Sequence, residues 1–251
     1  MLNYEISGNG TENLVLLHGF MENHLIWSDM EQFLSKKFRL IKIDLPGHGR
    51  SNIYGEIHTM EMMAEKVKEV TDKLNLNHFH LLGHSMGGYA SLAFAERFGE
   101  SLQSLTLFFS TYFSDDEEKK ETRRKSLRII AESLKTFVSA GVPNLFNPNE
   151  KDILEDKIEL AKEIAFSTPT EGVLAATKGM IERTDKQHIL ENLNAKIVII
   201  AGKYDNAVKT DLVINHLPNR ANIKSYILDC GHNGHWEKPE ICSAILNTEL
   251  L

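Results

Sequence analysis

Short hydrophobic segments alternate with helical segments along most of the chain. The hydrophobic segments have the length of buried strands and comprise residues 14–17, 40–43, 79–82, 105–109, 197–201 and 223–228. Between them, hydrophobic residues recur at spacings of three and four, as at Val67, Val70 and Leu74, which is typical of helices packed on one face. Strands separated by helices favour a largely parallel sheet, because the helices make the crossover connections and cover both faces.

The alternation stops between residues 111 and 190, where charged helical segments replace the strand signals. Residues 119–138 predict an amphipathic helix that lies over an apolar surface, with one face made of Arg123, Leu127, Ile130, Leu134 and Phe137. Prolines at positions 143, 148 and 169 then divide the segment into short helices. We therefore predict an α/β core domain of residues 1–110 and 191–251, with residues 111–190 inserted as a helical cap.

The charge balance argues against two classes of partner. The 251 residues include 28 Lys and Arg against 35 Asp and Glu, a formal net charge of -7, which offers no overall attraction to nucleic acid or to an anionic membrane surface. No segment has the roughly 18 to 20 uninterrupted apolar residues of a membrane span, and the first residues lack the pattern of a secretion signal. The two cysteines, Cys230 and Cys242, are expected to be reduced thiols. A cytoplasmic location is the expectation, and the sequence predicts no particular oligomeric state.

The first candidate for chemistry is a serine in a tight turn. The strand at residues 79–82 runs into Gly83-His84-Ser85-Met86-Gly87-Gly88, and a helical pattern follows over residues 86–98. This is the strand, turn and helix context that the G-x-S-x-G motif requires, with glycines two residues either side of the serine because a side chain there would collide with neighbouring backbone. Ser85 is therefore the candidate nucleophile, and the helix N-terminus behind it favours negative charge.

An acid and a histidine follow in the order that this motif requires. Asp205 comes just after the strand near residues 196–201, and His232 comes just after the strand near residues 223–228. Loops that follow the carboxyl ends of parallel strands share one rim of a sheet, so we expect Ser85, Asp205 and His232 to converge. Asp229 is a competing acid, but it stands at the end of a strand, and we favour Asp205.

His232 and His235 form an H-x-x-H pair of the kind that binds metals. Zinc sites on helices prefer a four-residue spacing together with a glutamate, and this pair lacks both features. We therefore predict no metal ion and no cofactor.

The motifs together resemble the α/β-hydrolase superfamily along the whole chain. Leu17-His18-Gly19-Phe20 resembles the oxyanion-hole loop of that family, residues 44–51 resemble its D-x-x-G-x-G-x-S turn, and residues 231–239 resemble its terminal histidine motif. The resemblance implies an α/β-hydrolase fold with an eight-stranded, mostly parallel sheet, helices on both faces and a helical cap. Only one short strand, near residues 3–7, precedes residue 14, so we expect seven or eight strands.

The resemblance also implies a mechanism. Ser85 would attack the carbonyl carbon while His232 removes its proton, and Asp205 would orient and balance the imidazolium. The backbone N–H groups of Phe20 and Met86 would form the oxyanion hole, and no cofactor would be needed. For His18 we favour a role in bracing its loop over a role as a second base.

Five further residues are predicted to contact a substrate: His84, Tyr89, Arg123, Arg124 and Phe137. His84 is either a wall of the pocket or simple packing, and Phe137 is either core or part of an acyl pocket. The basic run that includes Arg123 and Arg124 is either a solvated helix face or, through Arg123, a partner for a substrate carboxylate.

These predictions favour a serine hydrolase that cleaves a small carboxylic ester or a related acyl bond, with a small-molecule acyl substrate as its partner. Within the superfamily the chain is similar to the pimeloyl-ester esterases and to the menaquinone-pathway lyases, although Tyr89 stands where those lyases have an arginine. Ser85 argues against haloalkane dehalogenases and epoxide hydrolases, whose nucleophile is an aspartate. The alternatives are such a lyase, a carbon–carbon bond hydrolase with the same triad, or a non-catalytic small-molecule receptor of the same fold.

Overall fold

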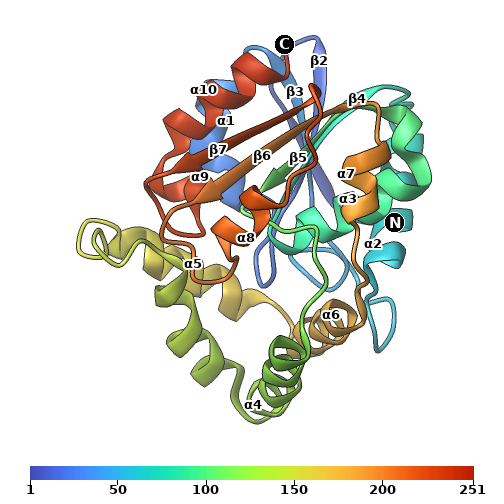
Figure 1. Cartoon of the computed structure of the whole chain (residues 1–251). Coiled ribbons are helices and arrows are strands. Elements are labelled where there is room, and N and C mark those ends of the chain that lie inside the picture. The colour runs from blue at the N-terminus through green and yellow to red at the C-terminus, as the bar shows by residue number, and fades with distance from the viewer.

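The computed structural model describes all 251 residues and has a seven-stranded sheet at its centre (Figure 1). The strands are β1 (Tyr4–Ser7), β2 (Glu12–Leu17), β3 (Phe38–Ile43), β4 (Phe79–His84), β5 (Leu102–Phe108), β6 (Lys196–Gly202) and β7 (Ile223–Leu228). They lie in the order β1-β3-β2-β4-β5-β6-β7, and β1 alone is antiparallel to its neighbour. The predicted fold class is confirmed, with seven strands.

Helices cover both faces of the sheet (Figure 1). One face carries η1 (His24–Trp27), α1 (Ser28–Leu34), α9 (Gly234–Glu237) and α10 (Pro239–Glu249). The other face carries α2 (Met60–Lys73), α3 (Met86–Phe98) and α7 (Gln187–Asn192). The remaining short helices of the core are η2 (Gly99–Ser101) and α8 (Thr210–Asn215).

Alternate residues of the central strands pack into two hydrophobic cores, one on each face of the sheet. In β2, Leu14 and Leu16 pack into the core that also contains Met30 of α1, whereas Val15 and Leu17 pack into the core on the side of α2 and α3. A strand that helices cover on both faces is a continuous hydrophobic run, which is why the central strands have a strong signal in the sequence.

The last strand, β7, is less buried than the sequence predicts. It lies at the edge of the sheet, and Lys224, Ser225 and Ile227 are exposed. An edge strand has a neighbouring strand on one side only. The prediction of a strand at residues 223–228 is confirmed, but this strand is only partly buried, although its segment has the length of a buried strand.

Five helices lie between β5 and β6. One of them, α7, covers the sheet, and the other four are α4 (Glu117–Gly141), η3 (Val142–Leu145), α5 (Glu155–Ser167) and α6 (Thr170–Glu182), which lie together below the sheet in Figure 1. The N-cap of α4 is Asp116, whose side chain accepts a hydrogen bond from the Lys119 backbone N–H at 2.8 Å. Ser133 has non-helical backbone angles (φ -162°, ψ 94°), so α4 is kinked there. The helix predicted at residues 119–138 is present but bent. That these helices form a cap domain stays a prediction.

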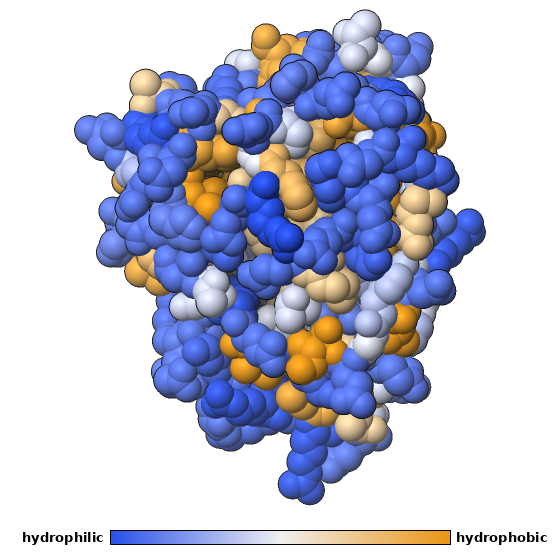
Figure 2. All heavy atoms as spheres, turned by 90° about the vertical axis from the view of Figure 1, so that its right-hand side faces the viewer, coloured by the Kyte–Doolittle hydropathy of each residue, from blue (hydrophilic) through white to orange (hydrophobic).

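The visible surface is mostly hydrophilic, and the two cysteines are not bonded to each other. Figure 2 shows that the side of the molecule where α2, α3 and α7 lie is mostly hydrophilic, with small separate hydrophobic areas. None of the helices is both long enough and apolar enough to cross a membrane. Cys230 and Cys242 are buried free thiols, and burial raises the pKa of both.

Candidate active site

Ser85 occupies a sharp turn between β4 and α3. Its backbone has a positive φ of 49° with ψ -114°, a conformation that costs a non-glycine residue on the order of 1–3 kcal/mol. The Ser85 N–H donates to the Phe108 carbonyl oxygen at 3.0 Å, and the Ser110 hydroxyl donates to the Ser85 carbonyl oxygen at 2.8 Å. These bonds hold the serine in the strained geometry that is typical of a nucleophile at a strand-to-helix turn.

Two glycines leave room for this turn. A Cβ atom on Gly83 would lie 2.3 Å from the Gly87 carbonyl oxygen, and a Cβ atom on Gly87 would lie 2.4 Å from the Leu17 carbonyl oxygen. Both distances are far inside van der Waals contact, so a larger residue fits only if the backbone moves. The steric reason that the sequence gives for these glycines is confirmed.

His232 and Asp205 are hydrogen-bonded partners in the loops that follow β7 and β6. The distance from His232 Nδ1 to Asp205 Oδ2 is 2.7 Å, and both side chains are almost completely buried. The other carboxylate oxygen of Asp205 accepts the backbone N–H groups of Ala207 (2.8 Å) and Val208 (2.9 Å), which fixes its orientation. Burial lowers the pKa of His232, but the charge of Asp205 and the hydrogen bond to it outweigh burial, and the pKa is raised above its ordinary value.

The competing acid, Asp229, is far less suited to this role. Its side chain is 69% exposed and lies 3.5 Å from the Lys203 ammonium group. The structure therefore pairs His232 with Asp205, as the sequence predicts, and leaves Asp229 in solvent.

Ser85 and His232 line one cavity of about 270 Å³. The core part of the chain contributes Phe20, Met21, Glu22, His84, Ser85, Tyr89, Asn206, Ala207 and His232 to its wall. The segment between β5 and β6 contributes Lys119, Arg123, Phe137, Gly141, Val142, Leu145 and Met180. The cavity has about the size of a small-molecule site and a mixed lining, in which 8 of the 16 residues are hydrophobic and most of the others are polar or charged.

The two backbone groups predicted for the oxyanion hole are free to donate. Phe20 lines the cavity, and Met86 is the first residue of α3, directly after Ser85. Neither of their N–H groups donates to a backbone carbonyl oxygen. Met86 is fully buried, so its N–H lacks solvent as an alternative partner.

His18 braces the loop that carries Phe20. Its Nε2 accepts the Leu45 backbone N–H at 2.9 Å, so its Nδ1–H donates to the Gly19 carbonyl oxygen at 2.7 Å. Burial lowers the pKa of His18, which keeps the ring neutral. Because both ring nitrogens are occupied, the bracing interpretation of His18 holds over a role as a base.

Four of the five predicted substrate contacts line the cavity, namely His84, Tyr89, Arg123 and Phe137. Arg124 is the exception. Its side chain is 48% exposed and lies 3.4 Å from Glu121, one helical turn away, and it is not part of the cavity wall. The prediction for Arg124 is corrected here, because the helix turns about 100° per residue and directs this side chain to solvent.

Arg123 is held by a carboxylate that a second arginine shares. Arg123 Nε donates to Asp115 Oδ2 at 2.6 Å, and Arg183 NH1 lies 2.8 Å from the same oxygen. Asp115 is buried, and although burial raises the pKa of its carboxyl, the hydrogen bonds and charges of the two guanidinium groups lower it overall. Two cations and one anion leave this group with a net positive charge beside the cavity.

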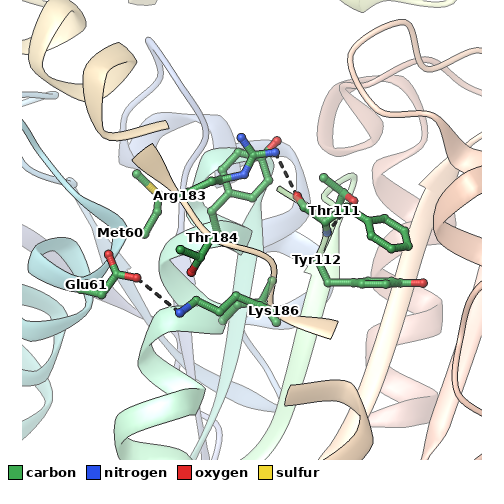
Figure 3. Close-up of a pocket in the computed structure, with 10 residues that line it drawn as sticks. Met60, Glu61, Thr111, Tyr112, Arg183, Thr184 and Lys186 are labelled. Carbon is green, nitrogen blue, oxygen red and sulfur yellow. Dashed lines mark hydrogen bonds and ion pairs between the residues drawn. The ribbon is translucent and has the colours of Figure 1, made fainter. Parts of the chain in front are cut away.

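Arg183, which the sequence analysis missed, also supports Tyr89. The guanidinium carbon lies 4.1 Å from the centre of the Tyr89 ring, which is a cation–π contact. Figure 3 shows Arg183 in a crevice that Met60 and Tyr112 also line, with Lys186 paired to Glu61 at 3.4 Å. This crevice has a volume of only about 10 Å³, no more than one water molecule needs, so it serves packing and not ligand binding.

Glu22 is the second residue that the sequence analysis missed. Its Oε2 accepts the Gly19 backbone N–H at 2.6 Å and lies 2.8 Å from His84 Nδ1. Burial raises the pKa of this carboxyl, but the charge of His84 and the hydrogen bond from it outweigh burial, and the pKa falls to about 2. No signal in the sequence marks this residue, because the polar residues Asn23 and His24 follow it directly.

Glu237 holds the loop that carries His232 from the other side. Its carboxylate accepts the backbone N–H groups of Gly231 (2.8 Å), Asn147 (3.0 Å) and Asn233 (3.1 Å). Asn147 belongs to the segment between β5 and β6, so one carboxylate joins that segment to the His232 loop. The sequence gives Glu237 only as part of the histidine motif.

Comparison with protein families gives one match that covers most of the core motifs. The model of the α/β hydrolase fold family matches residues 12–156, which is more than half of the chain. Among curated proteins, the chain is 26% identical to a 2-hydroxy-6-oxononadienedioate/2-hydroxy-6-oxononatrienedioate hydrolase of Pseudomonas putida, over 94% of this chain and 87% of that protein. It is 28% identical to a pimeloyl-[acyl-carrier protein] methyl ester esterase of Sodalis glossinidius, over 84% of this chain and 82% of that protein.

Among solved structures, the chain is similar to a thermophilic esterase from Thermogutta terrifontis, solved with malate bound. The TM-score is 0.93 and the sequence identity is 29%, and the match covers 99% of this chain and 92% of the esterase. The similarity therefore extends over the helices between β5 and β6 as well as over the sheet.

Proposed function

Because the chain belongs to the α/β hydrolase fold family, we propose that it is a serine hydrolase whose triad is Ser85, His232 and Asp205. The observation that carries this proposal is the 2.7 Å hydrogen bond from His232 to Asp205, at the wall of the same cavity that the strained Ser85 lines. The substrate we propose is a small carboxylic ester or a related acyl compound.

The geometry supports an acyl-transfer mechanism. Asp205 accepts the Nδ1–H of His232, so the lone pair of Nε2 is free to take the proton of the Ser85 hydroxyl. Ser85 Oγ attacks the carbonyl carbon, and the resulting oxyanion accepts the N–H groups of Phe20 and Met86, each worth about 3–4 kcal/mol in comparable enzymes. His232 then gives its proton to the leaving alcohol, and an acyl-serine remains.

The second half of the reaction uses the same groups. A water molecule loses a proton to His232 Nε2 and attacks the acyl carbon, and the tetrahedral intermediate again occupies the oxyanion hole. When this intermediate collapses, the bond to Ser85 Oγ breaks, His232 returns the proton to the serine, and the carboxylic acid leaves.

The lining of the cavity suggests what the acyl group is like. Phe20, Phe137, Val142, Leu145 and Met180 form an apolar wall suited to a hydrocarbon chain. Lys119 and Arg123 add positive charge to the cavity wall, although the formal net charge of the whole protein is -7. We therefore propose that Arg123 binds a carboxylate at the far end of the acyl group.

A carbon–carbon bond hydrolase is the second candidate. The Pseudomonas putida relative, named for its action on an oxononadienedioate, aligns over 94% of this chain. A lyase of the menaquinone type is less well supported, because Tyr89 replaces the expected arginine and Arg183 lies behind the Tyr89 ring, outside the cavity wall.

The first test compares the parent protein with Ser85→Ala on p-nitrophenyl esters of increasing acyl length. We expect the parent to turn over and the variant to lose at least about a thousandfold in kcat, as when a triad nucleophile is removed. The chain-length profile then gives the depth of the cavity. If both proteins are equally inactive on every ester, the esterase proposal is wrong, and dienedioate substrates and ligand binding without turnover become the next assays.

A further inference from the structure

Three side chains surround the Cα atom of Gly19 next to the candidate nucleophile. A Cβ atom on Gly19 would lie 2.7 Å from Glu22 Oε2, 2.8 Å from His84 Nδ1 and 3.2 Å from Ser85 Cβ. The oxyanion-hole loop, the nucleophile turn and the Glu22 side chain therefore meet at one point. The proposed triad does not use Glu22 or His84, so their arrangement needs its own explanation.

Both ring nitrogens of His84 face oxygen atoms that accept hydrogen bonds. Nδ1 lies 2.8 Å from Glu22 Oε2, and Nε2 lies 3.0 Å from the His232 carbonyl oxygen. His84 therefore bridges the Glu22 side chain after β2 and the His232 loop after β7.

Two further histidine rings pack against His84. They are His232 and His235, from the loop and helix after β7. His235 is completely buried, neither of its ring nitrogens has a hydrogen-bond partner, and its ring centre is 4.8 Å from that of His84. Burial lowers the pKa of His235 far below its ordinary value, so this ring stays neutral and acts as packing for His84.

We propose that Glu22 and His84 form a buried hydrogen-bonded pair that positions the three loops of the hydrolytic site, an inference that rests on the function proposed above. Glu22 holds the Gly19 amide and with it the loop of Phe20. His84 precedes Ser85 in the chain and holds the backbone of His232. One buried pair of side chains thus joins the oxyanion donor, the nucleophile and the base, and both members are positioning residues.

The positioning role is measured by kinetics on the best ester substrate. Glu22→Gln keeps the size of the side chain and an oxygen for the Gly19 N–H but removes the charge. We expect kcat to fall about 10- to 100-fold with KM nearly unchanged, because the loops hold the reacting groups and not the ground-state substrate. The double variant with His84→Gln should lose no more than the worse single variant, since the pair acts as a unit.

The control is Glu31→Gln, which breaks an ion pair with Lys42 at 2.7 Å but lies in α1 away from the cavity. Its kcat should match that of the parent. If Glu22→Gln folds and keeps the parent kcat, or if the losses of the two single variants add, the positioning role is refuted. If Glu22→Gln fails to fold, the same comparison of kcat and KM with His84→Gln decides the positioning role.

A fluorophosphonate that labels activated serines separates this inference from the proposed function. Labelling of Ser85 in the parent, together with an unaffected Glu22→Gln, leaves the triad in place and refutes only the positioning role. If Ser85 is not labelled and no ester is turned over, the triad proposal fails, and the proposal for Glu22 and His84 fails with it as a feature of a hydrolytic site.

Discussion

Arg123 and Arg124 are neighbours in α4, but their side chains meet different surroundings. Arg123 lines the cavity, pairs with the buried Asp115 and is 18% exposed, whereas Arg124 lies beside Glu121 in solvent. An exposed ion pair such as that of Arg124 contributes about 0–1 kcal/mol. A guanidinium at the wall of a cavity instead meets a ligand that has already left most of its water behind, so its interaction is stronger.

The pair provides a matched test of the proposed carboxylate contact. For the half-ester of a dicarboxylic acid, Arg123→Gln should raise KM about tenfold or more, because a hydrogen bond to a charged group is worth roughly 1.5–3 kcal/mol. For a neutral ester of the same length, KM should change little. Arg124→Gln should match the parent on both substrates. Equal effects of Arg123→Gln on the charged and the neutral ester would show that Arg123 supports the structure of α4 and does not bind a carboxylate.

The sequence does not predict which of two neighbouring side chains, such as those of Arg123 and Arg124, lines a cavity. The basic run in the sequence indicates a charged helix face, and Arg123 continues the apolar stripe, but which of the neighbouring arginines meets a cavity depends on the kink at Ser133 and on the packing of α4 against α6. The contact between Glu22 and His84 spans 62 positions and leaves no periodic signal.

The turn from β4 to α3 is the element that the sequence predicts best. Its strand, its glycines and its helix follow one another directly in the sequence, so the motif can be recognised from a short segment. The structure has the predicted strand, turn and helix. The positive φ, which the sequence analysis does not predict, falls on Ser85 itself, and the surrounding hydrogen bonds maintain it. Local motifs are predictable because steric conflict within a short segment leaves few alternatives.

Gly87→Ala tests the steric argument for this element. The new methyl group would lie 2.4 Å from the Leu17 carbonyl oxygen and 2.6 Å from the His18 carbonyl oxygen, so β2 and α3 would have to separate. We expect a loss of about 1–3 kcal/mol or more in the free energy of unfolding, measured with urea, and a loss of ester hydrolysis.

Gly141→Ala is the control for Gly87→Ala. Gly141 ends α4, and a Cβ atom there would meet nothing within 4 Å. Alanine stabilises a helix relative to glycine by roughly 0.5–1 kcal/mol, so this variant should be at least as stable as the parent. A Gly87→Ala protein as stable as the parent would mean that the turn relaxes more easily than its contacts indicate.

At the scale of the whole molecule, the sequence predicts which loops meet but not what joins them. Parallel strands bring the loops after β2, β4, β6 and β7 to one rim, which is why Ser85, Asp205 and His232 could be named together. The carboxylates that join those loops, Glu22 and Glu237, accept backbone N–H groups, which any sequence supplies. Their partners therefore become visible only in three dimensions.

The buried carboxylate of Glu22 also links the stability of the whole molecule to pH. Its pKa is about 2 in the folded protein against an ordinary value of 4.5, so the unfolded chain binds the proton more readily. The stabilising contribution is therefore present above about pH 4.5 and is lost as pH falls toward 2, and a shift of this size corresponds to roughly 3 kcal/mol at most. The free energies of unfolding of the parent and of Glu22→Gln, measured with urea, should differ most near neutral pH, and the difference should shrink steadily below about pH 4.5.

Glu163→Gln, which changes an exposed carboxylate on α5, should have the same free energy of unfolding as the parent at every pH. A difference between the parent and Glu22→Gln that stays constant down to acid pH would mean that Glu22 stabilises the fold by its shape and not by its charge.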